Sequence, residues 1–335
     1  MKKMKKITWI PLLIIIVGVC IALAGFAGGG GVKGIKGIAI DRGGLRIANT
    51  DLGELVKVDE SFTGVKEIEI RIDFLENVTL KEGDGFSVRG QNYERFGGLK
   101  AVQIGDTLQV TAVREGRWIG IGINDLGRGW NRLDTWVEIT YPKGMKLDSV
   151  RTEISAGRLF VTDLSAAIIT VTNDFGDIDL SSINGTDVIL ELSAGNAKVR
   201  DVSADMLTVS NDFGQITLGG VSSNTLVIKT SAGDFSADNV NTRDLYVDSD
   251  FGSVRFDRLV LGGTGIINMS SGEINIGLNM SEDDLSYDLS ASAGKVTVDG
   301  RSAGGIGGSI SNRTGGDASL MVASDFGAIT LRFMK

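Results

Sequence analysis

The sequence predicts an all-β protein, namely a parallel β-solenoid (β-helix-like) of 19-residue coils in a 38-residue double repeat, preceded by one N-terminal transmembrane helix. Three observations lead to this prediction. Glycine recurs every nineteen residues through the second half of the chain. Apolar residues keep fixed offsets from these glycines and alternate with polar ones, which is the strand period. A long uncharged segment follows a cluster of lysines at the N-terminus.

Residues 1–27 predict a membrane anchor. Four lysines lie within the first six residues, and the uncharged run Ile7–Ala27 is long enough as a helix to cross a hydrocarbon core of about 30 Å. The lysines predict a single-pass protein of the cell membrane, with a cytoplasmic N-terminus and an extracellular C-terminal domain. A cleaved signal segment is the alternative, because Ala22–Ala24 and Ala27 offer small residues to a peptidase. Residues 28–34 are rich in glycine and predict a tether.

Residues 35–148 predict an N-terminal β cap region that merges into the repeats of residues 149–335. Apolar and polar residues alternate in residues 68–72, 108–113 and 136–141, which is typical of half-buried strands. We therefore expect short, irregular strands before the first regular coil.

The nineteen-residue period is the strongest pattern in the chain. The glycines that mark it are Gly157, Gly176, Gly195, Gly214, Gly233 and Gly252. A glycine at a fixed point of every coil predicts a corner with a positive φ angle. Apolar residues lie two, four and seven positions after each glycine and seven positions before it, so one face of each coil should form a continuous core.

Two motifs alternate at these corners. Ser-Ala-Gly ends at Gly157, Gly195 and Gly233, while Asn/Ser-Asp-Phe-Gly ends at the other three glycines. The residue before each glycine is therefore alternately alanine and phenylalanine. The phenylalanines are Phe175, Phe213 and Phe251. We expect these side chains to point inward, where large and small residues would interdigitate.

The rhythm loosens after Gly252, and Ser324–Gly327 restores the motif close to the C-terminus. We expect this last coil to lie at the end of the stack, with the glycine-rich segment 304–316 folding back as its cap. The alternative is an exposed edge that serves as a docking surface or allows end-to-end self-association.

Tyr141-Pro142-Lys143-Gly144, followed by Thr-Glu-Ile-Ser-Ala-Gly at 152–157, resembles the start of the repeats in a bacterial "putative adhesin" solenoid family. The resemblance covers roughly residues 60–335. That family is a domain of unknown function, and it includes membrane-anchored proteins of Lia-type envelope-stress operons. The resemblance implies a parallel β-solenoid at the cell surface, with a role in adhesion or envelope stress.

Composition argues against several classes of function. The chain has no histidine and a single cysteine, Cys20, so it lacks the commonest general base and cannot form an internal disulfide or a thiolate metal cluster. Its net charge of −8 is opposite to that of a nucleic-acid-binding protein. We expect no cofactor, no metal and no nucleic-acid partner.

The segment between residues 114 and 136 is the candidate ligand or partner surface. The candidate residues are Arg117, Trp118, Arg128, Trp130 and Arg132. Tryptophan and arginine side chains can stack on sugars and bind anionic groups, so a cell-wall polymer or another envelope protein would be a suitable partner. The alternative is a hairpin whose tryptophans cover the end of the solenoid.

Two sets of acidic residues could suggest catalysis or metal binding. Asp174, Asp212 and Asp250 stack two coils apart, at about 9.6 Å, which is too far for one shared ion. We expect their motif to satisfy backbone amides at the corners. The cluster Glu282–Asp284 is expected to form a solvated loop.

These observations favour a non-enzymatic, membrane-anchored surface protein acting in adhesion, scaffolding or envelope-stress response. The alternatives are a polysaccharide-active enzyme built on a β-helix and a self-associating surface scaffold.

Overall fold

The structure is a computed structural model that describes residues 38–41, 44–47, 52–114 and 134–334. The chain divides into two compact units, Met1–Gly53 with Glu115–Leu133, and Glu54–Arg114 with Asp134–Lys335. The predicted anchor and tether lie outside the described residues. No helix in the described segments is both long enough and apolar enough to span a membrane.

In the first unit, the described residues form one antiparallel hairpin of β1 (Ile38–Asp41) and β2 (Gly44–Ile47).

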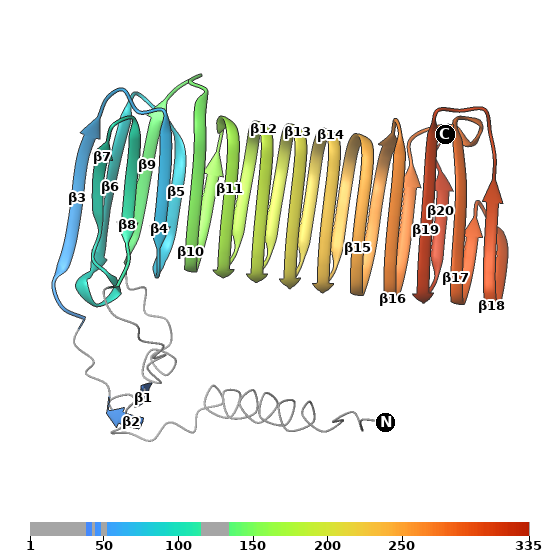
Figure 1. Cartoon of the computed structure of the whole chain (residues 1–335), viewed down its shortest axis with the longest axis horizontal. Helices are drawn as coiled ribbons and strands as arrows, with labels where there is room; N and C mark the ends of the chain where they lie inside the picture. Colours follow the sequence, from blue (N-terminus) through green and yellow to red (C-terminus); the bar gives the residue numbers. More distant parts are fainter. Residues whose placement is uncertain (1–37, 42–43, 48–51, 115–133, 335) are drawn as a thin grey trace, which may run out of the picture. The chain divides into compact units, whose positions relative to one another are not determined.

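The second unit is an all-β stack with two one-turn 3₁₀ helices, η1 (Glu94–Phe96) and η2 (Glu282–Asp284) (Figure 1). Its strands are β3 (Leu55–Phe62), β4 (Glu67–Ile72), β5 (Leu75–Gly83), β6 (Phe86–Tyr93), β7 (Lys100–Ile104), β8 (Thr107–Ala112), β9 (Trp136–Pro142), β10 (Leu147–Thr162), β11 (Ser165–Phe175), β12 (Ile178–Ala194), β13 (Ala197–Phe213), β14 (Ile216–Ala232), β15 (Phe235–Leu261), β16 (Thr264–Leu278), β17 (Leu285–Val298), β18 (Arg301–Asn312), β19 (Ala318–Phe326) and β20 (Ile329–Phe333).

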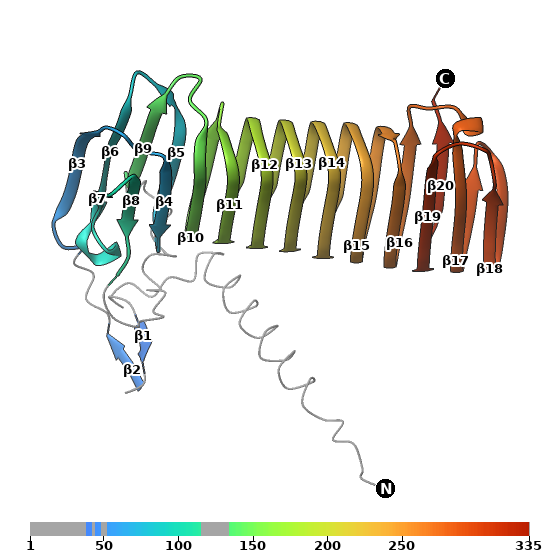
Figure 2. The ribbon, with the colours of Figure 1, turned by 45° about the horizontal axis from the view of Figure 1, so that its top comes forward.

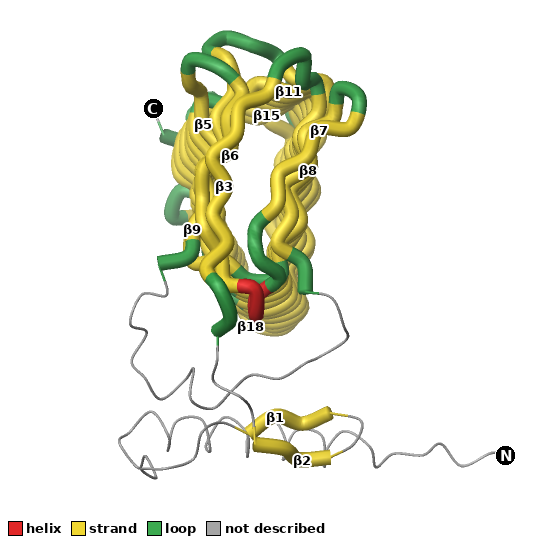
Figure 3. Tube along the Cα trace, turned by 90° about the vertical axis from the view of Figure 1, so that its left-hand side faces the viewer, coloured by secondary structure: helices red, strands yellow, loops and turns green. Residues whose placement is uncertain are grey.

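The parallel solenoid predicted from the glycine period is confirmed. From β11 to β15, residue i pairs with residue i+19 of the next coil along a parallel ladder. Viewed along the stack, the coils lie behind one another as an elongated ring (Figure 3). The repeat therefore sets the register, because a shift of one residue would turn every apolar side chain outward.

The core is a set of aliphatic columns inside this ring. Leu180, Val199 and Leu218, four residues after successive corner glycines, are at most 1% exposed. Phe235 and Phe256 enter the same core from neighbouring coils, with ring centroids 5.0 Å apart. Burial of one whole face of each coil provides the main stabilising term.

The corner glycines stack directly on one another. Their φ angles run from +125° to +153°. A Cβ atom on Gly214 would collide with the carbonyl oxygen of Gly195 in the preceding coil, and the same holds for each neighbouring pair in the column. The motif needs glycine here because both the backbone conformation and the close approach of the next coil exclude a side chain.

A second corner, which no residue pattern predicted, lies six residues after each glycine. Its residues adopt the left-handed conformation, with φ between +53° and +65°. They are Asp163, Ser182, Asp201, Gly220, Asn239 and Arg258. Aspartate, asparagine and glycine tolerate this conformation best, which explains the composition of most of the column.

The N-terminal end of the stack is not ordered as the sequence is. β4 and β5 pair with β10, while β8 and β9 stack outside β4 and β5. Three antiparallel pairings follow further out: β7 pairs with β8, β6 pairs with β9, and β3 pairs with β6. Antiparallel strands thus close this end, as Figure 2 also shows.

The C-terminal end departs from the expected order in a similar way. The last strands, β19 and β20, do not lie at the end of the stack; they insert between β16 and β17. β17 lies outside them, and the glycine-rich β18 pairs antiparallel with β17 as the terminal strand (Figure 1). The expectation that the last coil in the sequence is the last in space was wrong, because the hairpin β17–β18 leaves a gap that the C-terminal coil fills.

The glycine stack can be tested by comparing Gly214→Ala with Gly105→Ala. Gly105 also has a positive φ, +64°, but an added Cβ would meet nothing within 4 Å. We expect the Gly214 variant to lower the free energy of unfolding by about 3 kcal/mol or more, and the Gly105 variant by about 1 kcal/mol. Urea unfolding followed by circular dichroism measures both. Equal losses would contradict the role of the inter-coil contact.

Candidate interaction surface

In the Asn-Asp-Phe-Gly motif, asparagine is the residue that holds the corner. Asn173 and Asn211 are buried, and their Nδ2 atoms donate hydrogen bonds to the carbonyl oxygens of Gly157 at 3.3 Å and Gly195 at 3.0 Å. The aspartates that follow them point outward and have no such bond. The motif therefore holds the corner as expected, but through asparagine bonds to carbonyl oxygens and not through bonds to backbone amides. Strand alternation turns the asparagine inward and leaves the carboxylate in solvent.

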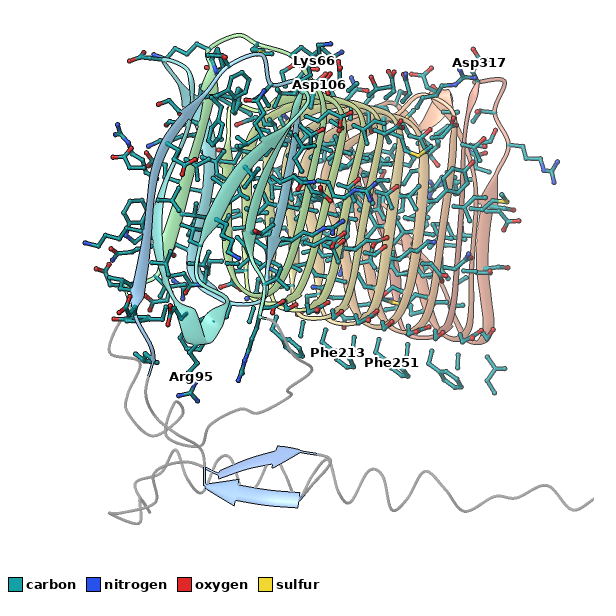
Figure 4. The ribbon with its side chains drawn as sticks, turned by 60° about the vertical axis from the view of Figure 1, so that its left-hand side comes forward. Lys66, Arg95, Asp106, Phe213, Phe251 and Asp317 are labelled. Carbon is teal, nitrogen blue, oxygen red and sulfur yellow. The ribbon has the colours of Figure 1, made fainter. Side chains whose placement is uncertain are left out.

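The phenylalanines of the motif also point outward. Phe175, Phe213 and Phe251 are 64%, 62% and 60% exposed. Figure 4 shows Phe213 and Phe251 projecting away from the edge of the stack. The expectation of inward packing was wrong because the inward positions lie three residues before and two after the glycine, so strand alternation breaks at the corner.

Tertiary structure extends this aromatic column. Insertion of β19 places Phe326, which is 64% exposed, between Ser271 and Ala293, and Ala293 pairs in turn with Ile306 of β18. Ile306 is 98% exposed. We call the whole column the Phe ridge. Its large members are Phe175, Phe213, Phe251, Phe326 and Ile306, and its small members between them are Ala194, Ala232, Ser271 and Ala293.

A column of aspartates runs beside the ridge. Asp174, Asp212, Asp250 and Asp325 each precede a phenylalanine of the ridge, and none forms a salt bridge or side-chain hydrogen bond with another described residue. On the other flank, Asp177, Asp234 and Glu273 outnumber Arg158 and Lys295. The ridge is therefore an apolar, aromatic strip in an acidic setting.

The residues proposed from sequence as a ligand surface are not placed. Arg117, Trp118, Arg128, Trp130 and Arg132 lie outside the described residues. At the borders of that segment, Trp136 on β9 is 36% exposed, and the backbone amide of Arg114 donates to Asp73 Oδ2 at 2.8 Å.

Within the described ranges, no three acidic, histidine or cysteine side chains gather closely enough to hold a metal ion. The carboxylates of the ridge belong to coils two apart, so no pair of them can share one ion.

A shallow polar groove of about 560 Å³ runs along a further side of the stack. Its lining includes a ladder of serine, threonine and asparagine side chains from successive coils. These side chains bond to one another, as Ser223 Oγ does to Thr242 Oγ1 and Asn224 Nδ2 to Asp205 Oδ1, both at 3.1 Å. The ladder thus joins neighbouring coils.

The acidic cluster expected to be a solvated loop has a structural contact. Glu282 accepts a hydrogen bond from Tyr287 Oη at 2.6 Å and pairs with Arg301 of β18. The bond from Tyr287, with the contribution of Arg301, lowers the pKa of Glu282 below its ordinary value. Burial and the same carboxylate raise the pKa of Tyr287 to about 12. The cluster ties the terminal strand β18 to the stack.

Tyr141 joins the cap to the regular coils. Its side chain is fully buried, and its hydroxyl donates to the carbonyl oxygen of Asp163 at 2.5 Å. Burial, assisted by Glu82 and Asp163, raises the pKa of Tyr141 well above its ordinary value. Asp163 lies in the second corner, so this bond fixes the first such corner of the stack.

Two columns of corners with positive φ angles, an aliphatic interior and antiparallel end strands define the class: a capped parallel β-solenoid. The chain belongs to the Toastrack DUF4097 family, whose model matches residues 65–331. This confirms the resemblance to a domain family of unknown function. No curated protein matches the chain.

Solved structures with a detectable likeness come from bacteria. A "putative adhesin" from Bacteroides fragilis is 11% identical, with a TM-score of 0.36 over 84% of this chain and 97% of its own. A "putative cell adhesion protein" from Clostridium sporogenes is 9% identical, with a TM-score of 0.22 over 84% and 99%. A "putative adhesin" from Parabacteroides distasonis is 11% identical, with a TM-score of 0.27 over 84% and 98%.

The orientation of the ridge phenylalanines can be tested against a buried phenylalanine of the same coils. We expect Phe213→Ala to lower the free energy of unfolding by less than about 1 kcal/mol, because most of the ring is already in solvent. Phe235→Ala should cost about 3–5 kcal/mol, because Phe235 is only 1% exposed. Chemical denaturation compares the two, and a large loss for Phe213→Ala would contradict the outward orientation.

The buried hydroxyl of Tyr141 predicts a pH effect. The side chain of an unfolded tyrosine ionises at about pH 10, whereas the folded Tyr141 keeps its proton to higher pH. The free energy of unfolding should therefore fall as pH rises above about 10. Tyr141→Phe should lose about 1 kcal/mol at neutral pH, and its stability should then fall less steeply than that of the wild type. Parallel curves from urea unfolding at pH 8 to about 12 would refute this.

Proposed function

We propose that this protein is a non-enzymatic, membrane-anchored surface protein whose solenoid presents the Phe ridge as a binding surface in adhesion or scaffolding at the cell envelope. The observation that carries the proposal is the ridge itself. Large apolar side chains at every second coil stay in solvent, although the same position in the coils between them is alanine or serine.

An exposed apolar strip of this length needs an explanation. Contiguous apolar patches on soluble domains commonly mark interaction sites, because they promote unwanted association when they serve no partner. The core does not require these rings, since they point away from it. A partner surface accounts for both their exposure and their regular spacing.

The fold supports this role. Register-locked coils hold the ridge residues in a straight array, so a partner meets them without the entropy cost of ordering a loop. Antiparallel strands cover both ends of the stack, which leaves its long sides as the extended surfaces for binding.

The location is part of the same proposal. The lysines and the uncharged run in residues 1–27 support a single membrane anchor with the solenoid outside the cell. The resemblance to proteins of envelope-stress operons supports a role in the response to envelope damage.

The proposal predicts that cells producing the protein bind to neighbouring cells or to isolated envelopes through the ridge. The double variant Phe213→Ala/Phe251→Ala should lose this attachment, while Phe160→Ala/Tyr246→Ala, which removes exposed rings elsewhere on the solenoid, should retain it. Attachment is counted by microscopy, and protease shaving of intact cells checks that each variant is displayed. Equal attachment by both variants, or a solenoid protected from protease, would overturn the proposal.

A further inference from the structure

The Phe ridge has a defined period as well as an apolar surface. Its large side chains stand two coils apart, at about 9.6 Å, and its five large members span about 38 Å. Between them lie four positions with small side chains, Ala194, Ala232, Ser271 and Ala293, which we call the hollows of the ridge. A linear ligand that fills the hollows must repeat at the same interval.

Polypeptide geometries differ in how well they match this interval. A polyproline II helix presents one face every three residues, or about 9.3 Å, so over four repeats it drifts from the ridge by only about 1 Å. An α-helix presents one face every seven residues, or about 10.5 Å, and drifts by about 4 Å over the same length. In a β-strand, residues three apart point to opposite faces, so a strand does not present one face at this interval. The polyproline II helix is the geometry that stays in register.

The aspartate column indicates the charge of the ligand. One carboxylate lies beside each phenylalanine of the ridge, with no salt-bridge partner among the described residues. A lysine or arginine side chain could pair with the carboxylate and also lie against the ring face. In a three-fold helix, one residue of each turn faces a hollow and a neighbouring one faces the flank.

The same charges argue against two other occupants. Two copies packed antiparallel, ridge against ridge, would place one aspartate column opposite the other, which is repulsive. A neutral or anionic glycan offers no cation to the column.

We propose that the Phe ridge binds an extended polypeptide in the polyproline II conformation that carries a basic residue at every third position. One apolar residue per turn, such as proline, occupies each hollow, and the basic residue pairs with the adjacent aspartate. This inference rests on the proposed function, because it names the partner of the same surface.

The test uses the full-length protein and the synthetic peptide (Pro-Lys-Pro)5, with binding followed by fluorescence anisotropy. We expect binding that weakens with added salt. A peptide of the same composition with its lysines grouped at one end, and (Pro-Glu-Pro)5, should bind at least about tenfold more weakly. Equal binding of the grouped peptide, or no binding of (Pro-Lys-Pro)5, would overturn the inference.

Variants separate insertion into the hollows from general adhesion to an apolar surface. Phe213→Ala/Phe251→Ala should weaken binding by about tenfold or more. Ala232→Leu adds apolar surface but fills a hollow, so it should also weaken binding. The same column carries phenylalanine in the adjacent coils, so the solenoid should tolerate this leucine, and thermal unfolding checks that it does. Tighter binding by Ala232→Leu would contradict the inference.

Asp212→Asn/Asp250→Asn should weaken binding and reduce its dependence on salt. Phe160→Ala/Tyr246→Ala is the matched control and should bind as the wild type does. Unchanged binding by the asparagine variant would overturn the role of the aspartates.

Two further outcomes identify a different occupant. Sedimentation that shows dimers of the wild type, lost in Phe213→Ala/Phe251→Ala, would replace the peptide with a second copy. Ridge-dependent binding of soluble peptidoglycan fragments without peptide binding would replace it with a glycan. In both cases the cell-attachment result decides the proposed function separately, so the two proposals can fail independently.

Discussion

The close stacking of successive corner glycines is the constraint on which the rest of the solenoid depends. Each glycine lies against the carbonyl oxygen of its predecessor, and a buried asparagine donates to that same column of carbonyl groups in two of the coils. This contact holds the coils at the spacing of a parallel ladder and fixes the register of every strand that leaves the corner. The aliphatic columns then follow, because their positions are counted from the glycine.

The corner also explains why the surface carries a regular array of apolar side chains. Strand alternation breaks where the chain turns, so the residue before the glycine points outward although its spacing from the buried asparagine suggests the opposite. The core therefore does not dictate the size of the side chain at that position. Phenylalanine alternates with alanine at this position, and aspartate alternates with serine beside it, with the same two-coil period.

The end strands of the stack cover the edge of the last coil, which would otherwise be exposed in any solenoid. At each end the chain leaves a space of one coil, forms outer strands, and includes an antiparallel closure. Tyr141 at one end and the Glu282–Tyr287–Arg301 cluster at the other attach these closures to the regular coils. At the C-terminal end the same rearrangement brings Phe326 into the ridge.

The sequence by itself determined the repeat, the parallel solenoid and its inward columns, because a period of nineteen with fixed apolar offsets permits one register. It also located Phe175, Phe213 and Phe251, but not their direction, since alternation cannot be counted through a corner whose geometry is unknown. The second corner, at Asp163 and its equivalents, could not be predicted from sequence, because the residue type at this position varies while the backbone conformation stays the same. Only the tertiary structure decided that the last coil inserts between β16 and β17, and hence that the ridge continues through Phe326 to Ile306. That order depends on pairing between strands distant in the chain, which no local pattern encodes.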